Sequence, residues 1–209
     1  MDHGAERAMD ADARASFVEL RGSLSRFTTA TGYVALGLLA VTLIIGPANL
    51  LLRRRNPVSS YFRRDVGAWT AIFSVVHVIA GFQLHGPPGP IDERILRYFF
   101  TRDGAPLLDS FGLGNWTGLG ATIIVLGLLA ISSDVALRKL KAARWKWLQR
   151  TSYALFALAI AHAVFYGALL RVTSPSTVML GVSVIAVVCA QAFGIWLSRR
   201  KHARALAQR

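Results

Sequence analysis

The chain has 209 residues, of which 54% are apolar and only 17% are charged. This composition is too apolar for an ordinary soluble domain, so we expect the lipid bilayer to be its solvent. The net charge of +13 does not indicate nucleic acid as a partner, because the basic residues stand in short runs at the ends of apolar segments, where such runs set membrane topology.

Several apolar stretches are long enough to cross a bilayer, since a spanning helix needs about 20 residues. The sequence therefore predicts an all-α, polytopic transmembrane helix bundle of about five helices, an integral membrane protein in contact with lipid. No alternating strand pattern and no glycine-rich phosphate loop is present, so we expect no nicotinamide or flavin dinucleotide domain. In chain order the predicted spans are 27–50, 66–85, 116–137, 148–170 and 177–197.

Charge asymmetry predicts the orientation of this bundle. Lys and Arg concentrate before the second span, before the fourth span and after the fifth, whereas the other connections carry fewer of them. The positive-inside rule therefore places the N-terminus outside and the C-terminus in the cytoplasm. On this scheme residues 1–26 form a polar outer tail, residues 27–198 one membrane domain, and residues 199–209 a basic cytoplasmic tail.

The outer connection between the second and third spans contains a proline-rich break followed by a helical pattern. Ile91, Ile95 and Phe99 recur at helical spacing, which predicts a short amphipathic helix lying in the interface. At the cytoplasmic end of the third span stands Asp134, for which an ion pair with Arg138 is the ordinary explanation.

Three histidines, His77, His85 and His162, fall in apolar segments, where an ionisable side chain marks a functional site by default. His77 lies thirteen residues after Arg64, and His162 lies twelve after Arg150. At 1.5 Å per residue both imidazoles fall roughly 18 to 20 Å above the cytoplasmic interface. Two histidines at one depth on two helices can face each other.

A pair of facing imidazoles can fill both axial positions of a haem iron. Small residues surround both histidines, among them Thr70, Ser74 and Gly81 near His77, and they leave room for a flat macrocycle. Small residues alone are explained as well by close helix packing. Together with two histidines at one depth, they favour His77 and His162 as metal ligands of one b-type haem.

Two further residues are candidates for contact with the cofactor. His85 lies close to the outer surface and could contact a haem propionate, handle protons near the haem edge, or act as an interfacial anchor. Arg171, at the outer end of the fourth span, could meet a propionate or could serve as an anchor in the same way.

Several runs of sequence resemble a known family. Thr31-Gly32, the run from Arg63 to Trp69 that leads to His77, and the run from Trp147 to Arg150 that leads to His162 resemble the ferric-reductase-like transmembrane domain superfamily. Within it the chain is most similar to the MsrQ/YedZ-type haem-binding membrane subunits of bacterial methionine sulfoxide reductase systems. The resemblance covers roughly residues 31–166.

The resemblance implies a haem-binding transmembrane domain over residues 27–198, with bis-histidine ligation by His77 and His162. It further implies a multi-pass protein of a bacterial inner membrane that carries electrons from a quinol or a cytoplasmic flavoprotein to an extracytoplasmic acceptor. Where the family has a histidine thirteen residues before the last ligand, this chain has Gln149, so we expect one haem and not two.

A different class of function stays open on the sequence alone. A haem-free membrane transporter, or a protein that handles metal ions or protons, could use the same intramembrane histidines.

Overall fold

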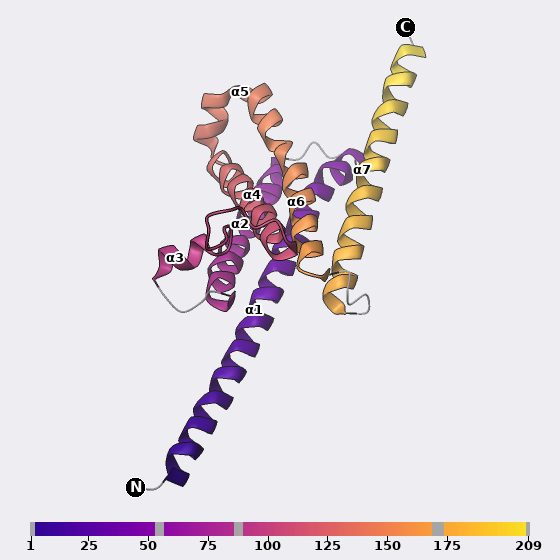
Figure 1. The fold of residues 1–209 in the computed structure, drawn as a ribbon. Coiled ribbons are helices and arrows are strands. Elements are labelled where there is room, and N and C mark those ends of the chain that lie inside the picture. The colour runs from indigo at the N-terminus through magenta and orange to yellow at the C-terminus, as the bar shows by residue number, and fades with distance from the viewer. Residues whose placement is uncertain (1–2, 53–56, 86–89, 169–173, 208–209) are drawn as a thin grey trace.

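The computed structural model describes residues 3–52, 57–85, 90–168 and 174–207, and in these ranges it confirms the all-α prediction (Figure 1). In this part of the chain the single extended feature is an isolated bridge between Phe100 and Pro106. The helices are α1 (His3–Leu51), α2 (Pro57–His85), α3 (Ile91–Leu96), α4 (Ser110–Ala130), α5 (Asp134–Gln149), α6 (Thr151–Phe165) and α7 (Pro175–Ala207).

Four helices in the described ranges are long and apolar enough to cross a membrane, namely α1, α2, α4 and α7. The protein is therefore an integral, multi-pass membrane protein. The fifth predicted span corresponds to α6, which has only 15 residues. Arg150 joins α5 to α6 in a helical backbone conformation, so the end of α5 lengthens this crossing.

The bundle consists of two antiparallel helix pairs. Helix α1 packs along α2, and α4 packs along α6, whereas contacts of α2 with α4 and of α1 with α6 are fewer. Helix α7 packs against α1. The two ends of the chain lie at opposite ends of the molecule (Figure 1). Which end faces the cytoplasm stays a prediction.

Helix α1 is much longer than the predicted first span. Its 49 residues extend about 74 Å at 1.5 Å per residue, and its N-terminal part projects well beyond the other helices (Figure 1). The polar segment before residue 27 is thus helical from residue 3 onward. Arg21 on this extension donates to the backbone oxygen of Leu84, 3.0 Å away, and so satisfies a carbonyl at the end of α2.

Helix α4 begins at Ser110, six residues before the predicted start of the third span at residue 116. The earlier start is due to a capping residue. The Asp109 side chain accepts a hydrogen bond from the backbone nitrogen of Gly112 at 2.7 Å, which starts α4 at Ser110. The helix then ends at Ala130, and Ser133 caps the separate, basic helix α5 in the same way.

Helix α5 forms an arch between α4 and α6 (Figure 1), bent at Lys141, whose φ is +58°. The Trp145 indole donates to the Ile131 backbone oxygen at 3.0 Å and ties the second arm of the arch to the end of α4. Asp134 pairs with Arg64 of α2 at 2.9 Å, so the ion pair expected with Arg138 is replaced by one between distant helices. The predicted short helix of the outer connection is α3.

Candidate functional site

The imidazoles of His77 and His162 lie next to each other between the two helix pairs. Their ring centres are 5.8 Å apart and their planes are nearly perpendicular, at 83°. His77 comes from α2 and His162 from α6. The structure therefore brings together the two histidines that share a depth in the sequence, and both are only half-buried because they border a cavity.

Each imidazole is oriented by a backbone carbonyl of the neighbouring helix. The Nδ1 atom of His77 lies 2.8 Å from the Thr28 oxygen of α1, and Nδ1 of His162 lies 2.8 Å from the Gly114 oxygen of α4. A carbonyl only accepts, so each Nδ1 carries the proton and donates it. In the neutral rings, Nε2 then holds the lone pair, which is the form that binds a metal.

A glycine lies four residues beyond each of these carbonyls. A Cβ added to Gly32 would lie 2.8 Å from Nδ1 and Cε1 of His77, and one added to Gly118 would lie 2.8 Å from Nδ1 of His162. Real Cβ atoms do not approach so closely, so only glycine lets the rings reach these helices. The same device, a carbonyl at position i and a glycine at i+4, thus occurs in both helix pairs.

A cavity of about 810 Å³ surrounds the two imidazoles, within the range of about 300 to 1,000 Å³ that is common for ligand and cofactor sites. Alanines, glycines and hydroxyl residues contribute much of its wall, and none of its described lining residues is an Asp, Glu, Lys or Arg. Lining residues close in sequence to the histidines include Thr70, Ser74, Val78, Gly81, Ala159, Ala163 and Tyr166.

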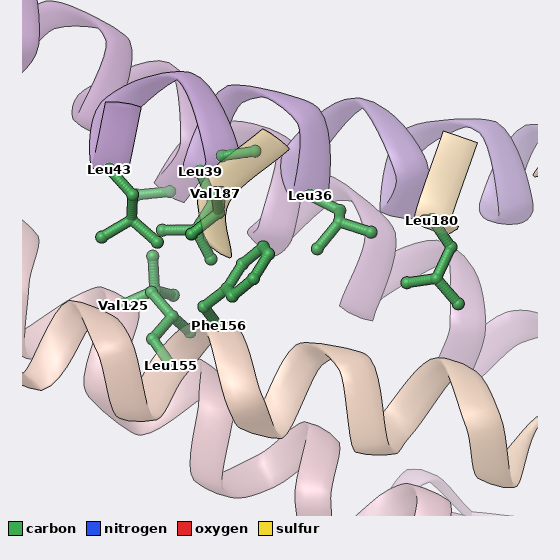
Figure 2. Close-up of a cluster of buried hydrophobic side chains, with 10 residues drawn as sticks. Leu36, Leu39, Leu43, Val125, Leu155, Phe156, Leu180 and Val187 are labelled. Carbon is green, nitrogen blue, oxygen red and sulfur yellow. The ribbon is translucent and has the colours of Figure 1, made fainter. Parts of the chain in front are cut away.

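Beyond the cavity, away from α3, the bundle is filled by apolar side chains. Leu43, Val125, Leu155, Phe156 and Val187 are all buried and belong to one cluster. Figure 2 shows these side chains pointing toward one another. Val125 and Leu155 also line the cavity, so this cluster forms its floor.

At the opposite end, hydrogen bonds among two tyrosines and an asparagine cover the cavity. The Tyr166 hydroxyl donates to Asn115 Oδ1 at 2.6 Å, and Asn115 Nδ2 donates to the backbone oxygen of Tyr98 at 3.0 Å. The Tyr98 hydroxyl in turn donates to the Gly81 oxygen at 3.0 Å. The Tyr166 ring also lies 4.8 Å from the His162 ring, so the cover touches the histidine pair directly.

The remaining predicted site residues are not brought into the site by the described structure. Only the backbone of His85 is described, as the last residue of α2, and Arg171 lies outside the described residues. Gln149 ends α5. No group of three or more His, Cys, Asp or Glu side chains that could hold a metal ion occurs in the described ranges, which leaves the histidine pair as the donor set.

Sequence reasoning missed the residues that hold the imidazoles. Gly114 and Gly118 stand four apart on α4, a small-xxx-small spacing that usually signals close helix packing. That spacing was a usable signal on α4. Thr28 acts through its backbone, so its side chain gave no indication of the contact.

Comparison with known proteins identifies one family. The model described as "Ferric reductase like transmembrane component" matches residues 31–160. The match includes Gly32, His77 and Gly118 and ends two residues before His162. Among curated proteins and solved structures, no match to the chain is found.

Proposed function

The chain belongs to the ferric-reductase-like transmembrane family, and we propose on that basis that it holds one b-type haem between His77 and His162 and transfers electrons across a membrane. Within the family we propose kinship with the MsrQ/YedZ-type subunits, and the inner membrane of a bacterium as its location. Membership of the family by itself indicates a membrane component of oxidoreductase type.

The observation that carries the proposal is the matched setting of the two imidazoles. Metal ligation by histidine nearly always comes with a hydrogen bond from the other ring nitrogen, and both Nδ1 atoms make that bond to a carbonyl. Bonds from imidazole nitrogen to a metal such as zinc are about 2.0 to 2.1 Å, and a ring nitrogen lies about 1.1 Å from its ring centre, so two opposed rings on one metal have centres about 6.3 Å apart. The observed separation of 5.8 Å is slightly shorter, so a small outward movement of the rings would admit a metal.

The cavity supports the same reading. Its volume of about 810 Å³ and its mostly apolar wall suit a large flat macrocycle. Gly32 lets the His77 ring lie close to α1, and Gly118 lets the His162 ring lie close to α4. Bound here, a b-type haem would supply a one-electron carrier whose iron has both axial positions filled. The residues of the chain hold the ligands in one tautomer and exclude water from the floor side.

The packed floor supports one haem per chain. A second haem on the far side would need space and two further ligands, whereas Leu43, Val125 and Phe156 fill that part of the bundle. Gln149 stands where the family pattern places a ligand for such a haem. The electron donor, a quinol or a cytoplasmic flavoprotein, would deliver electrons from the floor side, and an extracytoplasmic acceptor would take them from the covered side.

The test is a reduced-minus-oxidised absorbance spectrum of the purified chain, together with metal analysis. We expect a b-type signal with one iron per chain, lost in His77→Ala and in His162→Ala because each variant removes one axial ligand. His202→Ala, in the basic C-terminal tail, is the control and should keep the signal. Stoichiometric zinc or copper without iron would favour the metal- or proton-handling alternative, and a signal that survives both histidine variants would contradict the proposal.

A further inference from the structure

A second hollow lies on the membrane-facing side of α1, where α7 begins. This groove has a volume of about 470 Å³, and its walls are mostly apolar. Val34 and Ala30 of α1 form one side, and Pro175 and Met179 of α7 form the other. Because both helices are membrane spans, the groove opens towards lipid and not towards water.

The groove and the cavity lie next to each other. Ser25, Thr29 and Tyr33 of α1 and Ser176 of α7 line both of them. A molecule that lies in the groove therefore touches the same side chains that border the space around His77. Three of the four shared residues are small, so little bulk separates the two hollows.

Described side chains close the two ends of the cavity. On the floor side, Leu43 and Phe156 are buried in the apolar cluster. On the opposite side, the hydrogen bonds from Tyr166 to Asn115 and from Asn115 to Tyr98 join α6, α4 and the segment after α3 across the opening. On the α1–α7 side the described bonds run from the Thr177 hydroxyl to the Ala168 backbone oxygen and between the hydroxyls of Ser174 and Ser176, so they do not join α1 to α7 across the groove.

The side chains of Met179 and Arg26 suit the groove for the passage of a ligand. Met179 lines it and packs so closely on α1 that a Cβ at Gly37 would lie 2.8 Å from its terminal methyl carbon. An unbranched methionine side chain can move aside at low cost. Arg26 is the one Lys, Arg, Asp or Glu among the described residues that line the groove and the cavity, and it is exposed at the end of the groove.

We propose that the groove between α1 and α7 is a lateral entrance through which the haem reaches the histidines from the lipid bilayer. This inference rests on the proposed function. A haem is a flat apolar macrocycle with two carboxylates, so its faces suit Val34 and Met179. A guanidinium such as that of Arg26 pairs well with a carboxylate, and here it would hold one at the membrane surface during entry.

The experiment measures haem uptake. The full chain is purified with haem, stripped of it, returned to vesicles of phosphatidylcholine with phosphatidylglycerol, and mixed with hemin already dissolved in those vesicles. The rise of Soret absorbance gives the rate, and the final spectrum is compared with that of the original protein. Ala30→Trp and Met179→Trp fill the groove, whereas Val182→Trp adds the same bulk to an exposed position of α7 outside it.

We expect both groove-filling variants to load haem at least about tenfold more slowly, because the added indole fills the groove and must be displaced before haem can pass. Their final spectra should equal that of the parent, and Val182→Trp should load at the parental rate. Arg26→Gln, which leaves the groove open, should slow uptake by a smaller factor and should not change the final spectrum.

Parental uptake rates in both Ala30→Trp and Met179→Trp would overturn the entrance and leave the haem site itself intact. Equal slowing by Val182→Trp would also overturn it, because bulk at any lipid-facing position would then suffice. If the parent takes up no haem at all, or if the His77→Ala variant takes up haem as well as the parent does, the proposed function fails instead. The two failures are thus distinguishable.

Discussion

Around His77 and His162 the bundle is hollow and its helices carry glycines at their points of contact. Around Phe156, six residues before His162 on α6 and so about 9 Å along the helix, it is filled with large apolar side chains. We call these parts the histidine half and the packed half. Helices α1, α2, α4, α6 and α7 contribute residues to both halves, so the halves differ in side-chain size and not in the helices that build them. Leu43 and Phe156 hold the helices together in the packed half, and the histidine half is left free for a ligand.

Because the packed half holds the helices together, the bundle can contain a cavity of about 810 Å³ and stay assembled. In a membrane the helices gain little from the hydrophobic effect and associate through van der Waals packing and hydrogen bonds. The packed half supplies the packing. In the histidine half, the bonds from His77 to Thr28 and from His162 to Gly114 join the helices within each pair.

The largest expected effect comes from emptying the packed half. Phe156→Ala should lower the free energy of unfolding by about 3 kcal/mol, because the deleted ring leaves a void that the rigid neighbours cannot fill. Denaturation of the protein in detergent micelles by increasing dodecyl sulfate measures this change. Phe193→Ala, at a 43% exposed position on α7, is the control. An equal loss in both variants would mean that the two halves do not differ in packing.

A smaller effect is expected from filling the glycine contacts of the histidine half. Gly32→Ala and Gly118→Ala should each weaken haem affinity by about 1 to 3 kcal/mol, roughly 10- to 100-fold, because each Cβ forces an imidazole to move. Haem titration followed by absorbance measures both. The two losses should be similar, since the two helix pairs use the same carbonyl–glycine device.

The controls for this pair lie on the same two helices. A Cβ at Gly46 of α1 or at Gly127 of α4 would meet nothing within 4 Å, so Gly46→Ala and Gly127→Ala should leave haem affinity unchanged. If Gly32→Ala weakens binding and Gly118→Ala does not, the two pairs contribute unequally and His162 is not held as His77 is.

The smallest effect is expected from restoring the residue type that the family pattern has at position 149. Gln149→His should leave the stoichiometry at one haem per chain, because Leu43, Val125 and Phe156 still fill the packed half. The pyridine haemochrome assay, set against protein concentration, gives the ratio. Two haems per chain in this variant would show that a missing ligand, and not packing, sets the number.

Much of the architecture could be predicted because membrane helices are recognised in a sequence by the length and hydropathy of their apolar stretches. The adjacency of His77 and His162 followed from their equal distance to basic residues at one interface. The partners of the imidazoles could not be predicted, because a backbone carbonyl such as that of Gly114 has no sequence signature. Depth along a helix follows from residue counting, whereas rotation and crossing angle depend on packing.

Helix boundaries were least predictable where polar residues continue a helix. The segment before residue 27 is polar and still helical in α1, since helix formation there does not need an apolar face. The partner of Asp134 was mistaken for a similar reason. An (i, i+4) neighbour is visible in the sequence, whereas Arg64 approaches Asp134 only once α2 and the start of α5 have come together.

The packed half also has an electrical consequence. A layer of leucine, valine and phenylalanine has a low dielectric constant, so part of the transmembrane voltage should fall across it. In the orientation proposed above, each electron that reaches His77 and His162 from the cytoplasm crosses this field. Moving one charge through 100 mV involves about 2.3 kcal/mol, so the thickness of the Phe156 layer would set how strongly the membrane voltage drives or opposes the transfer.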